Sequence, residues 1–375
     1  MELRKGWPPF CSRYLVLVLM LISFQIRVFN QESFNWETPF KKCWELAVGF
    51  GAIGGVASDN NSLIFNTDRN TLYSINVESG KENWKTTLGG NIRLELISDK
   101  KSIIFFSSIE TIDNNNNNNN LIVYSIDNRT GITNWRFETQ INGKLTILQN
   151  ENQFFLVENN GLINCFDKIE GKRIWKKNLS TEIESAIILD SNQLLVLTSK
   201  EFTILSTKIG DILKVISIKQ KLSNILFFNN SKKEFIAGNS TGNLFSYSLI
   251  GNKTLWSVKL GGGITSLLIT DFGLLVSSLD NFIYLFDIKN GRLKWRKRIS
   301  GRINITPTII DKYLIVLNSS TNIALIIDIK SGKSINQISI NEDDVFLGSP
   351  IIFNDFIVFR SYRGIYAFSN LSCQK

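Results

Sequence analysis

The sequence predicts an all-β fold: an eight-bladed β-propeller that follows an N-terminal signal or anchor segment. A glycine-containing turn recurs seven times, at spacings of 51, 40, 39, 41, 40 and 41 residues. A period in this range is typical of repeat architectures. A strand with a tryptophan follows most of these turns, and the two ends of the repeat region carry complementary halves of an eighth unit.

The N-terminal segment differs from the rest of the chain. Arg4, Lys5 and Arg13 precede an apolar run from Tyr14 to about Ile26. A basic flank and about thirteen apolar residues favour a secretory signal over a membrane span of about twenty. Residues 1–27 are therefore expected to be a signal peptide or, since no small-x-small cleavage site follows, an uncleaved anchor. Residues 28–41 are expected to be a linker.

A lipid anchor is not supported by the positions of the cysteines. Lipidation would need a cysteine just after the apolar run, but Cys11 precedes the run and Cys43 lies too far beyond it. We therefore expect export, with membrane association through the N-terminal segment if that segment is retained.

Each repeat contains two or three short segments rich in Ile, Leu, Val, Phe and Tyr, such as residues 61–67, 71–77 and 83–88 in the first repeat. Such segments, separated by Asn, Asp, Ser and Gly, predict antiparallel strands of about five residues. The glycine ends each hairpin turn, where a left-handed backbone is needed. The turn glycines are Gly80, Gly131, Gly171, Gly210, Gly251, Gly291 and Gly332.

The repeated tryptophans are expected to pack between neighbouring units. In four repeats the tryptophan lies four residues after the turn glycine; these tryptophans are Trp84, Trp135, Trp175 and Trp295. Trp256 lies five residues after its glycine, which indicates a one-residue bulge or a shifted glycine. An indole at this place can bury roughly 200 Å² against the next unit. Because the tryptophans recur as a set, a site that stacks one cofactor is disfavoured.

The two ends of the repeat region complement each other. Residues 43–49, with Trp44, look like a tryptophan strand without a preceding turn, and residues 363–371 look like the strand before a turn. Pairing them completes an eighth unit and removes the exposed edges. We therefore expect one propeller over residues 42–372. Closure would also bring Cys43 near Cys373, either as a disulfide in an oxidising compartment or as two unpaired cysteines at opposite edges of one blade.

No catalytic, cofactor-binding or metal-binding residues are predicted. The chain has no histidine, which excludes Ser-His-Asp and Cys-His catalysis. The asparagine-rich residues 113–120 predict a loop. This run begins like a calcium-binding loop, but Tyr124 stands where a bidentate glutamate is required. We therefore expect no cofactor and no enzymatic activity.

The net charge of +9 suits an anionic partner such as an acidic protein or a membrane surface. The densest basic stretch is a candidate rim for an acidic partner, or else protects a strand edge by its charge. Nucleic acid is disfavoured by export and by the lack of interleaved exposed aromatic residues. We expect a monomeric propeller with a protein partner. The basic residues of this candidate rim are Arg292, Lys294, Arg296, Arg298 and Arg302.

The repeat pattern of strand, Asp or Ser, a short turn ending in Gly, three residues and Trp resembles that of the pyrroloquinoline-quinone-type propellers. The Gly-His and Trp-Asp signatures of WD40 repeats are missing. The resemblance covers roughly Cys43 to Leu371. In size and layout the chain is similar to the BamB family of the outer-membrane β-barrel assembly machinery. That resemblance implies a non-enzymatic periplasmic scaffold that binds the barrel-assembly protein and helps to deliver unfolded barrel precursors.

Two other classes remain as alternatives. A quinone-dependent dehydrogenase would imply a calcium site, a catalytic aspartate and often adjacent cysteines, whereas no two cysteines here are adjacent. A luminal stress-sensor propeller of the secretory pathway would suit the glycosylation sequons at Asn128, Asn239 and Asn304.

Overall fold

The structure is a computed structural model. It describes residues 34–48, 52–58, 61–67, 71–89, 96–98, 102–110, 119–217, 224–229, 234–248, 250–251, 253–303, 305–317, 321–353, 355–371 and 373. The strands in these ranges are β1 (Lys41–Ala47), β2 (Ala52–Ser58), β3 (Ser62–Thr67), β4 (Thr71–Asn76), β5 (Glu82–Thr87), β6 (Leu96–Ser98), β7 (Ser102–Glu110), β8 (Asn119–Asp127), β9 (Thr133–Ile141), β10 (Leu145–Gln149), β11 (Gln153–Glu158), β12 (Leu162–Asp167), β13 (Arg173–Asn178), β14 (Ile183–Asp190), β15 (Gln193–Thr198), β16 (Glu201–Ser206), β17 (Ile212–Ser217), β18 (Asn224–Asn229), β19 (Glu234–Gly238), β20 (Asn243–Ser248), β21 (Lys253–Lys259), β22 (Ile264–Thr270), β23 (Gly273–Ser278), β24 (Phe282–Phe286), β25 (Leu293–Arg298), β26 (Thr308–Ile310), β27 (Tyr313–Val316), β28 (Ile323–Asp328), β29 (Ser334–Ser339), β30 (Ile351–Phe353), β31 (Phe356–Arg360) and β32 (Gly364–Ser369).

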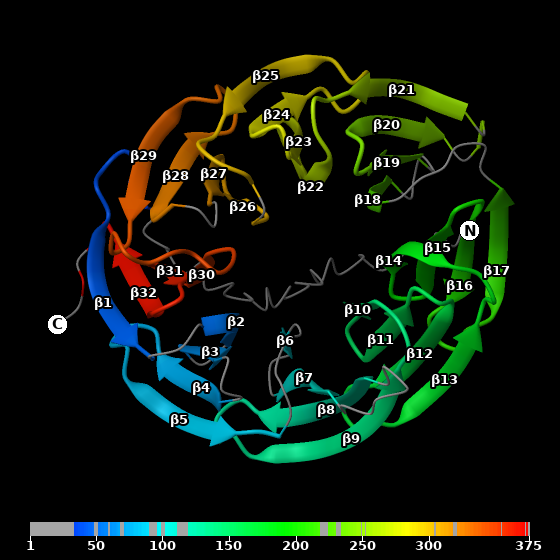
Figure 1. The fold of residues 1–375 in the computed structure, drawn as a ribbon, viewed down its shortest axis with the longest axis horizontal. Coiled ribbons are helices and arrows are strands. Elements are labelled where there is room, and N and C mark those ends of the chain that lie inside the picture. Colours follow the sequence, from blue (N-terminus) through cyan, green and yellow to red (C-terminus); the bar gives the residue numbers. More distant parts are fainter. Residues whose placement is uncertain are drawn as a thin grey trace, which may run out of the picture.

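The strands form eight four-stranded antiparallel sheets, which we call blades 1 to 8. Blades 1 to 7 are β2–β5, β6–β9, β10–β13, β14–β17, β18–β21, β22–β25 and β26–β29, and blade 8 is β30, β31, β32 and β1. The blades lie in a ring with their first strands toward the centre and their last strands at the circumference (Figure 1). The predicted all-β fold and the eight-bladed propeller are therefore confirmed.

The burial of each strand follows from its place in the blade. All six residues of β3 and of β23 are buried, because neighbouring blades cover both faces of these strands. Outer strands are more exposed, and in β21 every second residue is exposed. Both patterns give cores that lie between blades. One cluster, for example, joins Ile236 of blade 5 to Leu274 and Val276 of blade 6.

Blade 8 closes the ring with strands from both ends of the described chain. β1 pairs antiparallel with β32, with Trp44 opposite Ala367 and Ala47 opposite Gly364. In Figure 1 the blue β1 lies at the circumference beside the red β32. The fourth strand of this blade is therefore supplied from the N-terminal side, without a hairpin turn between β32 and β1.

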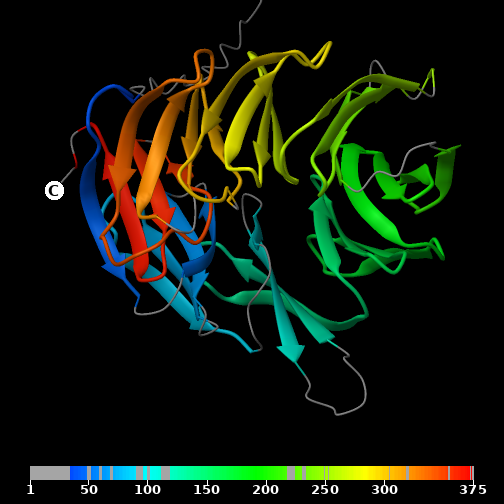
Figure 2. The same cartoon turned by 45° about the horizontal axis from the view of Figure 1, so that its top comes forward.

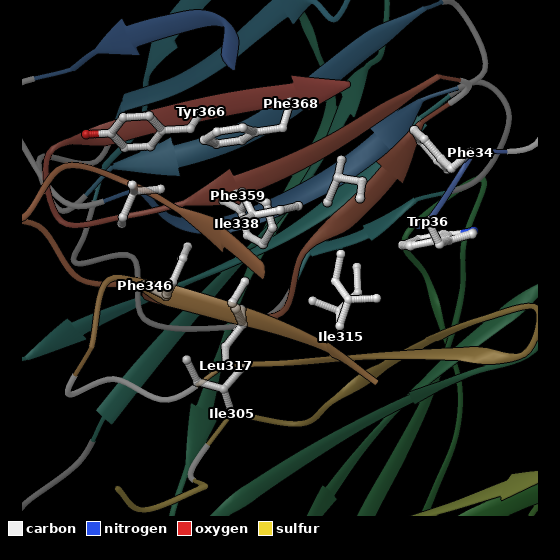
Figure 3. Packing of buried hydrophobic residues seen from close by; sticks show 14 residues of the cluster. Phe34, Trp36, Ile305, Ile315, Leu317, Ile338, Phe346, Phe359, Tyr366 and Phe368 are labelled. Atoms are coloured by element: carbon white, nitrogen blue, oxygen red, sulfur yellow. The ribbon is translucent and has the colours of Figure 1, made fainter. Parts of the chain in front are cut away.

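The prediction of a linker over residues 28–41 is wrong for residues 34–40, which pack onto the propeller. We call these residues the N-terminal arm. Phe34 and Trp36 are 9% and 4% exposed and belong to the cluster between blades 7 and 8 (Figure 3). The Trp36 ring lies 5.0 Å from that of Tyr313. The arm is ordered because its aromatic side chains fill this space, which a linker would leave open.

Blade 2 departs from the others in length. β7 and β8 have nine residues each and extend beyond the neighbouring blades (Figure 2). Asn119 and Asn120, predicted to be in the loop, pair with Glu110 and Ile109 instead. The backbone groups of these asparagines can form β-sheet hydrogen bonds where the two strands extend past the core. The rest of the predicted asparagine loop, and the predicted signal or anchor in residues 1–27, lie outside the described residues.

Candidate partner-binding surface

The tryptophans of the outer strands connect neighbouring blades through one recurring contact. We call it the tryptophan latch: the indole lies against the turn glycine of the next blade, and its Nε1–H donates to the carbonyl three residues before that glycine. Trp295, for example, lies against Gly332, and its Nε1 is 2.9 Å from the Ile329 oxygen. The hydrogen-bonded latches are Trp44–Val77, Trp84–Asn128, Trp175–Thr207, Trp256–Ile288 and Trp295–Ile329.

The tryptophan latch explains why the turn residue is a glycine and why its backbone lies in the left-handed region. Gly332 has a φ of 69°, in the left-handed region, and a Cβ built on it would be 2.7 Å from the Trp295 ring. The indole therefore occupies the place of a side chain. Trp135 lies against Gly171 in the same way, but its buried Nε1–H has no partner among the described residues.

The register also resolves the irregular fifth repeat. Trp256 pairs with Ser246, as Trp84 pairs with Ser74. Both blades have the same register shift one residue further along. The bulge is therefore common to the repeats, and it is the glycine, Gly251, that lies one position early. Gly251 is also missing from the turn glycines with a positive φ.

The closing blade carries a covalent bond and a buried carboxylate. Cys43 of β1 and Cys373 form a disulfide with their Cα atoms 5.3 Å apart. Asp344, 2% exposed, accepts hydrogen bonds from the Ser361 and Tyr366 hydroxyls at 2.6 and 2.8 Å. Burial and this carboxylate raise the pKa of Tyr366. The acceptor capacity of Asp344 is further used by the backbone N–H groups of Val345 and Arg363, which gives this acid a structural role.

The five predicted basic residues are all exposed. We call them the basic strip. Lys294, Arg296 and Arg298 alternate along β25, so they share one face of this outer strand. Lys294 donates to the Phe272 carbonyl at 2.6 Å, and the Arg296 guanidinium lies 5.3 Å from the centre of the Phe282 ring. Among the described residues, no Asp or Glu forms an ion pair with the strip.

Groups suited to metal or thiol chemistry are few. Within the described residues, no group of three or more Cys, Asp or Glu side chains is placed to hold a metal ion. Cys165 is buried, and its burial, with the nearby Asp167 charge, raises the pKa of the thiol to about 12. It therefore lies in the core as a neutral thiol. No helix in the described ranges is long and apolar enough to cross a membrane.

The fold and its repeated latches define the class of protein as an eight-bladed propeller built from quinoprotein-like repeats. The family model described as outer membrane protein assembly factor BamB matches residues 33–150, 118–215 and 216–372. The chain belongs to this family. The outer membrane protein assembly factor BamB of Moranella endobia (strain PCIT) is 22% identical over an alignment of 363 residues, and the match covers 88% of this chain and 90% of that protein.

Solved structures show the same fold. BamB from Moraxella catarrhalis superposes with a TM-score of 0.67 at 14% identity, covering 88% of this chain and 99% of that one. The computationally designed Ika8 protein gives 0.69 at 12% identity, with 88% and 99% covered. The C-terminal WD40 domain of Sif2 gives 0.66 at 11% identity, with 89% and 99% covered.

Proposed function

We propose that this protein is an exported, non-enzymatic interaction scaffold that assists the assembly of outer-membrane β-barrel proteins. The observation that carries the proposal is the match to the BamB family model, which extends over residues 33–372. The relative from Moranella endobia, described as an outer membrane protein assembly factor, aligns over nearly the whole of both chains. This supports a common role for the complete propeller.

The chemistry of the chain agrees with a binding role. A histidine base is missing from the sequence, and the buried Asp344 carboxylate is saturated by the hydroxyl and backbone donors of its own blade. The exposed surface that the structure describes includes the outward faces of strands such as β21 and β25 and the turns beside them. Surfaces of this kind bind other polypeptides through shape, apolar contact and charge.

We place the protein in the periplasm, either free or held at the membrane by its N-terminal segment. The basic flank and apolar run before Ile26 support export. The Cys43–Cys373 disulfide fits an oxidising compartment such as the bacterial periplasm. The basic strip on and beside β25 would face an acidic patch of a protein partner.

The proposal can be tested by crosslinking in the protein's own cells, followed by capture of the full-length chain and identification of the proteins bound to it. The expected result is recovery of a barrel-assembly protein or of barrel precursors, together with a fall in folded outer-membrane barrels when the gene is deleted. Wild-type protein should restore those barrels. Unchanged barrel levels after deletion, in a protein that binds quinone and calcium and reduces a dye with alcohols or sugars, would instead establish the dehydrogenase.

A further inference from the structure

The turns between the third and fourth strands of blades 1 to 7 lie on one face of the ring, because all blades have the same strand order (Figure 1). The turns between first and second strands share this face. In blade 3, for example, the Lys168 N–H donates to the Asn152 carbonyl at 3.0 Å and so joins the two turns. We call this side of the propeller the turn face. Its outer turns are residues 77–81, 128–132, 168–172, 207–211, 250–251, 288–292 and 329–333.

Blades 3, 4 and 5 carry exposed aliphatic side chains at the circumference of the turn face. Their outer turns hold Ile169, Ile209 and Ile250, which are 80%, 62% and 79% exposed. A register shift leaves one residue of the outer strand unpaired close to the turn. In blades 3, 4 and 5 this residue is aliphatic and exposed, namely Ile174, Leu213 and Leu255. In blades 1, 2 and 6 it is Asn83, Asn134 and Lys294.

We call these aliphatic residues the aliphatic rim: Ile169, Ile174, Ile209, Leu213, Ile250 and Leu255. Neighbouring blades contribute to the same surface. Gly210, next to Ile209, lies against the indole of Trp175, which follows Ile174. Soluble proteins rarely expose neighbouring apolar side chains over a large area unless that surface binds something. The rim is therefore a candidate binding surface.

Positive charge surrounds the rim on the turn face. The exposed acids of the outer turns are Glu78, Glu170 and Asp211, and Glu170 is paired with Lys172 at 2.8 Å. The turns between first and second strands, nearer the axis, add the exposed acids Glu151, Asp271 and Asp311. At the circumference the basic residues predominate. Those exposed in the outer turns are Lys81, Arg129, Lys172, Lys208, Lys289, Arg292, Lys330 and Lys333.

The opposite face has no such excess of one sign. Its exposed acids include Glu182, Glu342 and Asp343, and Asp343 is paired with Arg363. Lys144 and Lys200 are exposed on the same side. The two faces of the propeller therefore differ in charge, and the basic circumference coincides with the aliphatic rim.

The N-terminal arm joins the propeller on the turn face. The ring of Trp36 lies 5.0 Å from that of Tyr313, the first residue after the turn between β26 and β27. The Asn370 amide donates to the Thr38 hydroxyl at 3.1 Å. Asn370 follows β32, the third strand of blade 8, and third strands end at this face. The basic flank and apolar run that precede the arm in the sequence are therefore connected to the propeller on the side that carries the rim.

We propose that the turn face docks on a membrane surface that contains anionic lipids. The isoleucines of the rim enter the boundary between headgroups and acyl chains, and the surrounding Lys and Arg side chains meet the lipid phosphates. Apolar burial and attraction to anionic headgroups add together in binding at a membrane surface. Protein interfaces are instead enriched in Tyr, Trp and Met, whereas the rim consists of Ile and Leu. The inference goes beyond the proposed scaffold function and does not depend on a barrel-assembly partner.

The test places an environment-sensitive dye on the rim of the full-length protein. In the variant Cys11→Ser, Ile209→Cys, the dye reacts at position 209, because Cys43 is bonded to Cys373 and Cys165 is buried. Vesicles of phosphatidylcholine and phosphatidylglycerol with brominated acyl chains should quench this dye. Vesicles of phosphatidylcholine alone should quench it much less. The control is the same dye in Cys11→Ser, Leu279→Cys, since Leu279 is 46% exposed on the opposite face.

Substitutions on the turn face separate the apolar from the charged contribution. The pair Ile169→Asp, Ile250→Asp should raise the concentration of mixed vesicles that gives half-maximal quenching at position 209 by about tenfold or more. Lys208→Glu should raise it by about fivefold or more, and Lys208→Arg should leave it unchanged. The matched controls on the opposite face are Tyr362→Asp and Lys200→Glu, both at exposed positions.

Equal quenching at positions 209 and 279 would overturn the proposal, because the N-terminal segment alone would then hold the protein at the vesicle. Equal quenching by vesicles with and without phosphatidylglycerol would overturn it as well. A dye response that rises with protein concentration in the absence of vesicles would identify a second copy of this chain as the occupant of the rim, against the proposal. Since the vesicles contain no assembly protein, failure here leaves the capture experiment as an independent test of the scaffold function.

Discussion

At the scale of single residues, the latch glycine has two reasons to resist substitution. Gly332 has a left-handed φ of 69°, which costs an L-residue about 1 kcal/mol, and a Cβ would lie 2.7 Å from the Trp295 ring. Gly332→Ala must therefore displace the indole and weaken its hydrogen bond to Ile329. We expect the free energy of unfolding to fall by about 2 to 3 kcal/mol, measured by urea denaturation.

Gly251→Ala is the matched control for this prediction. Gly251 lacks the positive φ of the other turn glycines, and a Cβ added to it would come no closer than 3.4 Å to the flexible Lys253 side chain, its nearest neighbour. The free energy of unfolding should change by less than about 0.5 kcal/mol. An equal loss in both variants would show that the indole contact is not the cause.

At the scale of elements, the disulfide takes the place of a hairpin turn. In blades 1 to 7 a covalent turn joins the third strand to the fourth, whereas in blade 8 these are β32 and β1, from opposite ends of the chain. Cys373 lies six residues after Ala367, the residue opposite Trp44. Gly80 likewise lies six residues after Ser74, the residue opposite Trp84. The cysteine therefore stands at the position of a turn glycine, and its bond to Cys43 restores the missing connection.

Reduction of the Cys43–Cys373 bond is expected to destabilise the ring. The bond spans 330 residues of sequence, and its removal frees a long loop in the unfolded chain, which costs up to about 5 kcal/mol in the chain-entropy model. The midpoint of urea unfolding should fall when the wild type is reduced. It should not respond to reductant in the double variant Cys43→Ser, Cys373→Ser. An unchanged midpoint for the reduced wild type would show that backbone pairing alone holds β1.

The sequence predicts some elements of the blade much better than others. The hairpin of third and fourth strands carries the repeated glycine and tryptophan, so strands such as β24 and β25 can be predicted directly. The innermost strands carry no such mark. β26 and β30 have three residues each, too short to show a period. The pattern therefore predicts two or three strands per unit where the structure has four.

The candidate surfaces also differ in how well the sequence predicts them, because some depend on neighbouring residues and others on residues far apart in the sequence. The basic strip is a local run of charges and is visible in the sequence. The N-terminal arm is held by amides far away in the sequence: the Asn336 amide donates to the Trp36 carbonyl across 300 residues, and the Asn370 amide donates to the Thr38 hydroxyl across 332 residues.

At the scale of the whole molecule, the charge should govern association with a partner. The net charge of +9 produces a positive field, and Lys294, Arg296 and Arg298 concentrate it on one outer strand. Opposite charges across an interface raise the association rate, and added salt screens this effect over about 10 Å at 0.1 M. Capture of an acidic assembly partner should therefore weaken as the salt concentration rises.

Reversal of the three charges on β25 isolates the contribution of the strip. In the triple variant Lys294→Glu, Arg296→Glu, Arg298→Glu, we expect the association rate with the captured partner to fall by roughly tenfold or more at low salt, with little change in the dissociation rate, as measured by surface plasmon resonance. The free energy of unfolding should change little, because these side chains are exposed. A triple reversal in blade 3, at Lys172, Arg173 and Lys176, changes the net charge equally and is the control.

If both variants slow association equally, the net charge of the molecule attracts the partner and the strip is not its docking site. A larger effect at β25 would place the partner against blade 6.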